Sequence, residues 1–183
     1  MPNEWGGFLL GAASSSLVVP LLLGLLRLRR VPVAPGWAVV LRRGERTRVS
    51  LRSRLVWPGT EVYRLAVHPH GFDIELRDAD AVWSKDRARI EVVARVRVRI
   101  DPGQAVAVLD WLGCERASDG KVLADLFAPS IEEALHAVAS TFTGEDVYTR
   151  RLEFRDRVLE VVAPHLRGFV MDDLAISTFQ KIG

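Results

Sequence analysis

The sequence has a single cysteine, Cys114, among its 183 residues. One cysteine excludes an intramolecular disulfide framework and fits a reducing cytoplasm. Its simplest interpretation is a small buried apolar side chain, with acylation as the alternative. The sequence also lacks a glycine-rich phosphate loop, a nucleophile elbow and a Walker pattern. These absences argue against an enzyme.

Histidine is scarce as well, with four residues in the chain. His68 and His70 are close in sequence, but a metal site needs three or four ligands. The other two, His136 and His165, belong to separate predicted helices. Glu133 and His136 have the Glu-x-x-His spacing of di-iron bundles, which require a second such pair and two further glutamates. We therefore predict no catalytic, metal or cofactor site.

Charge is absent from the 22 residues between Trp5 and Leu26. At about 1.5 Å per residue, a helix of this length spans roughly 33 Å, which exceeds a hydrocarbon core of about 30 Å. We predict a transmembrane helix with Trp5 at the far interface and a kink at Pro20. Two alternatives remain open. A cleaved signal peptide is disfavoured by the acidic start, and a monotopic hairpin would bend at Pro20.

Three arginines, Arg27, Arg29 and Arg30, follow the uncharged stretch, whereas the N-terminal flank has no basic residue. Basic residues stay on the cytoplasmic side of a spanning helix. We therefore predict a single-pass protein of the cell membrane, with its N-terminus outside and its C-terminal domain cytoplasmic. Together with Arg42 and Arg43, these arginines are expected to contact anionic lipid headgroups.

The first third of the chain has little negative charge. Residues 1–60 hold nine arginines and two glutamates, a net charge of +7, so the remainder contributes −5 to the overall +2. This asymmetry favours an anionic bilayer as partner. The alternative is that the arginines between positions 46 and 54 only solvate strand faces. Nucleic acid is disfavoured because the basic stretch has no interleaved aromatic residues and adjoins the predicted anchor.

Short apolar runs separated by turn residues predict a mostly antiparallel, β-rich unit over residues 31–100. Its expected strands are 37–41, 62–67, 72–76 and 89–100. The last is the clearest, because its even positions are apolar and its odd positions are mostly arginine or glutamate.

Arginines along strand 89–100 need acidic neighbours, because directly opposed like charges destabilise a strand pair. Asp73 and Glu75 on the preceding strand have the right sign. A hairpin turn at residues 84–87 would place Glu75 near Arg97 and Asp73 near Arg99.

The apolar period changes after residue 100 and predicts helices over 101–112, 119–141 and 150–167, then a strand over 174–179. One side of the third helix is expected to be buried through Leu152, Leu159, Val162 and Leu166. The sequence therefore predicts an α+β protein with a membrane anchor (1–30), a β-rich subdomain (31–100) and an α/β subdomain (101–183).

Several motifs follow one another in a specific order behind the membrane segment. They are Val33–Val40, Arg54–Pro58, the turn Trp83–Asp86, Ser140–Tyr148 and Leu174–Ser177. Together they resemble the SPFH or band 7 family, which includes stomatins, prohibitins and flotillins. The Val56-Trp57-Pro58 step and the threonine-acid-tyrosine stretch are most similar to flotillin-like members.

The resemblance implies membrane attachment, assembly into a large homo- or hetero-oligomeric ring or cage, and no catalysis. The expected function is a scaffold that organises a membrane microdomain. The alternative is a regulatory partner of another membrane protein, such as a protease or a transporter. Family members usually continue into a long charged coiled coil, whereas this sequence ends at Gly183. Whether such a coiled coil normally follows is left open.

Charges of alternating sign on the third predicted helix are our candidates for the oligomer contact. They are Glu153, Arg155, Asp156, Arg157 and Glu160. A mixed surface of this kind suits a neighbouring subunit that presents the same charges after a rotation. The alternative is that they only solvate an exposed helix face.

Overall fold

The computed structural model describes residues 28–182, with side chains described up to residue 176. The predicted transmembrane segment with Trp5, Pro20 and Leu26, and the following Arg27, lies outside the described residues. Within residues 28–182, every helix is too short or too polar to cross a bilayer.

Five short strands form the N-terminal half. They are β1 (Arg29–Val31), β2 (Trp37–Arg43), β3 (Arg46–Ser50), β4 (Arg54–Val56) and β5 (Glu61–Ala66). β2 lies between β3 and β5 in an antiparallel sheet, and β1 pairs with β4 in a separate antiparallel ribbon. The turns after β2 and β4 contain Gly44 and Gly59, both at positive φ, where glycine avoids the strain that a Cβ would cause.

A second antiparallel sheet is built around one long strand. Its elements are β6 (His70–Leu76), the short helix η1 (Asp78–Asp80), β7 (Val82–Trp83), β8 (Arg89–Ile100) and β9 (Phe169–Ile182). β8 pairs with β6 and β7 along one edge and with β9 along the other. The predicted strand 89–100 is confirmed, and its even positions are fully buried, as the alternation requires.

Helical segments fill the chain between β8 and β9. They are η2 (Pro102–Gln104), α2 (Ala105–Leu112), α3 (Cys114–Ala117), α4 (Gly120–Ala139), α5 (Gly144–Thr149), α6 (Arg151–Val162) and η3 (Ala163–His165). Three polar side chains, Asp101, Asp119 and Thr143, cap η2, α4 and α5 by accepting a backbone N–H. Such caps satisfy backbone N–H groups that have no partner inside the helix.

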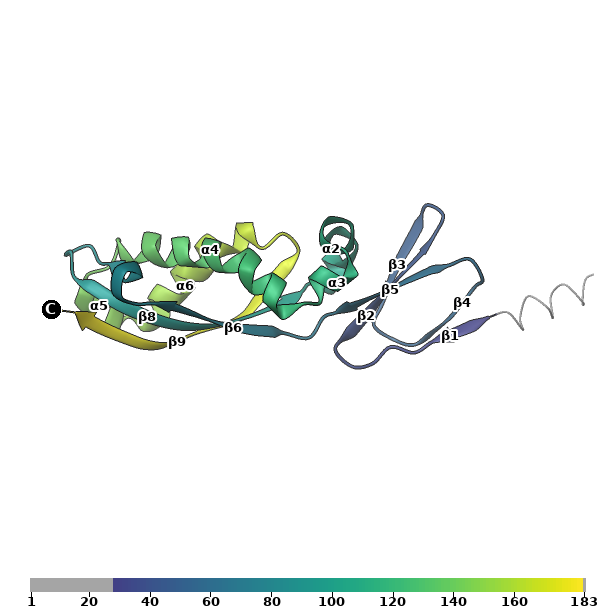
Figure 1. Ribbon diagram of the computed structural model, residues 1–183, viewed down its shortest axis with the longest axis horizontal. Helices are drawn as coiled ribbons and strands as arrows, with labels where there is room; N and C mark the ends of the chain where they lie inside the picture. Colours follow the sequence, from purple (N-terminus) through teal and green to yellow (C-terminus); the bar gives the residue numbers. More distant parts are fainter. Residues whose placement is uncertain (1–27, 183) are drawn as a thin grey trace, which may run out of the picture.

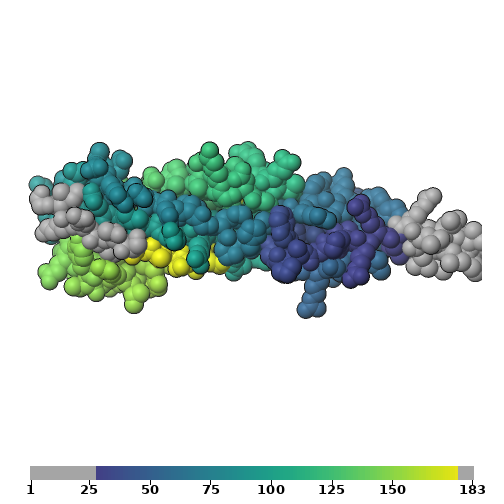
Figure 2. All heavy atoms as spheres, turned by 60° about the horizontal axis from the view of Figure 1, so that its bottom comes forward, coloured from purple at the N-terminus to yellow at the C-terminus, as the bar shows by residue number. Residues whose placement is uncertain are grey.

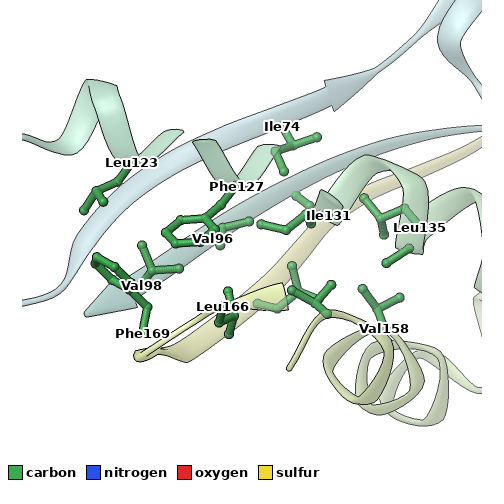
Figure 3. Close-up of a cluster of buried hydrophobic side chains, with 14 of the residues drawn as sticks. Ile74, Val96, Val98, Leu123, Phe127, Ile131, Leu135, Val158, Leu166 and Phe169 are labelled. Carbon is green, nitrogen blue, oxygen red and sulfur yellow. The ribbon is translucent and has the colours of Figure 1, made fainter. Parts of the chain in front are cut away.

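The main core lies between the second sheet and helices α4 and α6. Figure 3 shows side chains of β6, β8, α4 and β9 meeting in this cluster, among them Ile74, Val96, Phe127, Ile131 and Phe169. The rings of Phe127 and Phe169 meet edge to face with centroids 5.0 Å apart. Figure 1 shows α4 running along the sheet. The predicted α+β class with antiparallel sheets is confirmed.

Strands β6 to β8 share their core with the helices. They were grouped by sequence with the preceding strands as residues 31–100, because all of them are β. In the structure β6 and β7 pair with β8 and pack against α4, and β8 also pairs with β9, the last strand of the chain. The predicted division at residue 100 stays a prediction.

The predicted apolar side of the third helix is partly confirmed, since Val162 and Leu166 are buried. Leu152 is 68% exposed, whereas Phe154 and Val158 are fully buried. Phe154, Val158 and Val162 follow each other at four-residue spacing, which places them on one side of the helix. The prediction about Leu152 was wrong because hydrophobicity alone does not reveal which side of a helix α4 covers.

The predicted register between β6 and β8 is also wrong. Asp73 lies opposite Arg95 instead of Arg99, and Glu75 lies opposite Val93 instead of Arg97. The β7–β8 hairpin does have the expected turn, with Val82 opposite Ile90. However, the residues of η1 lie between β6 and β7 and do not pair with β8. The partners of β6 on β8 are therefore shifted by four positions from those expected of a continuous hairpin.

The expected relief of like charge on β8 is present with these other partners. Arg95 donates two hydrogen bonds to the Asp73 carboxylate at 2.8 and 3.1 Å. Arg99 instead donates to Asp172 of β9 at 2.6 Å. The strand on the other edge of β8, β9, therefore supplies a carboxylate that the predicted hairpin did not include.

Candidate functional site

The β1–β5 half forms one end of the molecule. Figure 1 shows these strands together at one end of an elongated shape, with the C-terminal end of β9 at the other. Figure 2 shows part of the same half, in purple and blue, as a continuous surface. Because β1 lies at the start of the described chain, Arg29 and Arg30 lie at this end.

A cleft opens beside the β2–β3 hairpin, against β4 and the turn that follows it, with a volume of about 370 Å³. It is lined by Leu41, Arg43, Arg46, Arg48, Arg54, Leu55, Val56, Trp57 and Thr60. Arg46 and Arg48 are two residues apart on β3 and therefore point to the same face. Arg43 lies opposite Arg46 across the strand pair. We call the space lined by Arg43, Arg46, Arg48 and Arg54 the arginine cleft.

Positive charge in the arginine cleft is uncompensated. No carboxylate lines it, and within residues 28–176 none of its four arginines forms an ion pair. The Arg43 guanidinium lies 6.0 Å from the centroid of the Trp57 ring, a cation–π contact that leaves the charge in the cleft. Guanidinium groups bind phosphate and carboxylate through paired hydrogen bonds, so this geometry suits an anion with several oxygens.

Large apolar side chains are exposed beside the arginine cleft. Leu55 is 65% exposed and Trp57 is 51% exposed, and both line the cleft. Exposed apolar groups rimmed by polar ones are typical of interaction surfaces. Tryptophan beside basic residues is characteristic of the interface between water and a bilayer.

The residues predicted to contact lipid headgroups lie in three places. Arg29 and Arg30 are exposed on β1, where they line a smaller cleft together with Arg64. Arg43 belongs to the arginine cleft. Arg42 points elsewhere and is described next.

Arg42 connects the two halves of the protein. Its guanidinium donates a hydrogen bond to Oδ1 of Asp110 on α2 at 2.5 Å and lies 5.8 Å from the centroid of the Tyr63 ring. The hydrogen bond that Arg42 donates to the Asp110 carboxylate raises the pKa of Arg42. A headgroup contact at Arg42 would compete with this bond. Neighbouring residues of a strand point to opposite faces, which separates Arg42 from Arg43.

Sequence reasoning did not single out Arg46, Arg48 and Arg54 as site residues. It left their role open between attraction to a membrane and solvation of strand faces. The alternation of Arg46 and Arg48 with Thr47 was the available signal, since it places both arginines on one face. Arg54 belongs to another strand, and only the tertiary structure shows that it lines the same cleft.

The five charged residues proposed as oligomer contacts form ion pairs within their own helical region. Arg155 pairs with Asp156 at 2.8 Å, and Arg157 pairs with Glu160 at 2.8 Å. Glu153 pairs with Arg150, the residue preceding α6. These pairs lie on an exposed surface, and their role between subunits stays a prediction.

His68 and His70 lie between the two halves. Their ring centroids are 4.6 Å apart, and Nε2 of His70 is buried without a hydrogen-bond partner among the described residues. Burial lowers the pKa of His70, and the neighbouring His68 lowers it further. Among the side chains of residues 28–176, no three His, Cys, Asp or Glu groups gather closely enough to hold a metal ion. Cys114 is partly buried against the main core.

Comparison with known proteins agrees with the arrangement of strands and helices. No curated protein sequence shows a significant match to the chain. The family model described as "SPFH domain / Band 7 family" matches residues 34–180, which include β2 to β8, all the described helices and most of β9. This match covers most of the 183 residues, and the chain therefore belongs to the SPFH domain / band 7 family.

Proposed function

We propose that this protein is a membrane-anchored, flotillin-like scaffold that assembles into large oligomers and organises a patch of bilayer. Proteins with an SPFH domain are membrane-associated scaffolds or regulators and are often oligomeric. The observation that carries the proposal is the arginine-rich, partly apolar surface of the β1–β5 half. This surface belongs to the half of the protein that follows the uncharged segment 5–26 in the sequence.

In this proposal the segment 5–26 crosses the membrane and the remainder is cytoplasmic. The β1–β5 half then faces the cytoplasmic leaflet, whose anionic lipids attract juxtamembrane arginines by about 1 kcal/mol each. We call β6 to β9 and the helices the α/β half. Its paired surface charges and its larger hydrophobic core suit a part of the molecule directed away from the lipid. One anchoring helix gives no lateral order, so a scaffold also requires contacts between subunits.

The first test is the particle size of the full chain extracted in detergent. A scaffold should form very large particles by itself, measured by size-exclusion chromatography with light scattering. A regulator of another membrane protein should instead co-purify with that protein in a smaller complex. A wild-type chain that is monomeric in mild detergent and in native nanodiscs would contradict the scaffold proposal.

The second test addresses the predicted contact on α6. Changing both Asp156→Lys and Glu160→Lys should reduce the particle size, because the reversed charges repel the arginines of the neighbouring subunit. The matched control changes Glu115→Lys and Asp125→Lys, which alters net charge equally on α3 and α4. If the α6 variant keeps its full particle size, this helix is not the contact.

Topology can be tested independently by cysteine labelling in a Cys114→Ala background. An impermeant reagent added to intact cells should label Asn3→Cys and should not label Thr60→Cys. Labelling at position 60 from outside would contradict the proposed orientation.

A further inference from the structure

We propose that the arginine cleft is a specific binding site for the phosphate groups of one anionic phospholipid. This inference rests on the proposed membrane association and identifies the ligand class of the β1–β5 surface. It goes beyond general attraction between a basic surface and a bilayer, because it assigns a lipid to one cleft with named side chains.

The first argument is the juxtaposition of like charges inside a small sheet. Arg43 and Arg46 are directly opposed, and Arg48 follows on the same face of β3. Such opposition destabilises a strand pair unless a counter-charge lies between the side chains. A phosphate group supplies that charge, and its oxygens accept the paired N–H donors of several guanidinium groups.

The second argument is a comparison with the arginines of β8. There Arg95 and Arg99 lie on an exposed strand face and each pairs with an aspartate of a neighbouring strand. These two exposed arginines of the second sheet therefore have carboxylate partners in the neighbouring strands. The arginine cleft has none among the described residues, which indicates that its counter-charge comes from a ligand.

The third argument concerns the source of the phosphate. Leu55 and Trp57 line the cleft and are exposed for more than half of their surface. A free phosphate ion gains nothing from these apolar groups, whereas a phospholipid places its glycerol and acyl region beside them. We therefore assign the site to a lipid headgroup. Because four arginines line the cleft, a headgroup with two phosphates should bind more tightly than one with a single phosphate.

The experiment uses the full chain in nanodiscs and follows hydrogen–deuterium exchange of the backbone amides in β3 and β4. Nanodiscs contain phosphatidylcholine alone, or phosphatidylcholine mixed with phosphatidylglycerol or with diphosphatidylglycerol. We expect both anionic lipids to slow exchange in β3 and β4, with the larger effect for the lipid that has two phosphates. Exchange in α4 and β8 should be unchanged, which also reports that the fold is intact.

The decisive variant is Arg46→Gln with Arg48→Gln, and its matched control is Arg97→Gln with Arg116→Gln. Both pairs remove two exposed positive charges, but only the first lies in the arginine cleft. The cleft variant should lose the lipid-dependent protection, and the control should keep it. Equal loss in both variants, or no lipid dependence in the wild type, would overturn the proposal.

A further arm adds inorganic phosphate to nanodiscs of phosphatidylcholine alone. No protection of β3 and β4 is expected, and full protection by phosphate would overturn the assignment to lipid. The proposed function fails separately, through a monomeric wild-type chain or its loss from the membrane fraction. A wild-type chain that assembles normally, but whose cleft is indifferent to lipid, would refute only this inference.

Discussion

The two halves of this protein use the same residue type, arginine, in opposite ways. In the α/β half, Arg95 and Arg99 of β8 each pair with an aspartate of a neighbouring strand. In the β1–β5 half, four arginines share a cleft without a carboxylate. The hydrophobic cores of the two halves also differ in size. The β1–β5 half has a small cluster of Val31, Val39 and Val56, whereas the α/β half has the large cluster under α4 and α6. We therefore expect the α/β half to supply most of the stability, whereas the β1–β5 half is the one that we propose to bind lipid.

The halves are nevertheless joined by specific contacts. Arg42 of β2 bonds to Asp110 of α2, and the backbone N–H of Ala66 donates to Oγ of Ser118 at 3.0 Å. Val40 and Leu65 of the first sheet also belong to the main core cluster.

The strongest way to test this division is to remove core side chains from each half. Phe154→Ala should lower the free energy of unfolding by about 3–5 kcal/mol, because it leaves a cavity in the main core. Val56→Ala removes about two methyl groups from the small cluster and should cost about 1–2 kcal/mol. Urea denaturation of the full chain in detergent measures both. Leu152→Ala, on the exposed side of α6, is the control and should change stability by less than about 0.5 kcal/mol. Equal losses in both halves would contradict the division.

Two glycines at positive φ provide a second comparison. At Gly168, with φ of 91°, an added Cβ would lie 2.9 Å from Cγ2 of Val108 and 3.1 Å from Cβ of Gln104. Gly168→Ala should therefore cost about 2–4 kcal/mol, combining backbone strain with overpacking. Gly59 has φ of 77° but no neighbour within 4 Å, so Gly59→Ala should cost only about 1 kcal/mol of strain. Similar thermal shifts for the two variants would show that packing around Gly168 is looser than the structure indicates.

The junction between the halves should respond to pH through His70. Its pKa is lowered, first by burial and then by His68, while the charge of Asp119 acts in the opposite direction. The unfolded chain therefore binds a proton more readily than the folded chain, and stability should fall as pH drops through the ordinary histidine pKa of about 6.5. His70→Gln should reduce this slope in urea titrations between about pH 7.5 and about pH 5.5. An unchanged slope would exclude His70 as its source.

The smallest expected effect concerns the exposed ion pair on the second sheet. A double-mutant cycle with Asp73→Asn and Arg95→Gln should show a small favourable coupling, because Arg95 donates to Asp73 and lowers the pKa of that carboxyl. The same cycle with Asp73→Asn and Arg99→Gln should show none, since Arg99 bonds to Asp172. Coupling to Arg99 in place of Arg95 would restore the register expected from the hairpin alone.

Much of the fold was predictable because it depends on neighbours in sequence. The alternation along β8 and the helix starts expected at residues 101 and 119 are local patterns, and the structure confirms them, with Asp101 and Asp119 as side-chain caps. The register of β6 was not predictable, since η1 removes residues from the ladder without any change in hydrophobic pattern. The candidate site was partly predictable: the abundance of arginine was visible, but its gathering into a cleft was not.

Sequence alone determined where charge and apolar surface occur along the chain, because composition and local period are properties of consecutive residues. It therefore indicated the uncharged segment, the basic residues that follow it and the strand alternation. Tertiary structure alone decided which arginines meet. Arg54 reaches the cleft of Arg43 and Arg46 from another strand, while Arg42 bonds to a helix 68 residues away in sequence. Such partners depend on chain reversals and on which face each layer covers, and no local pattern records either.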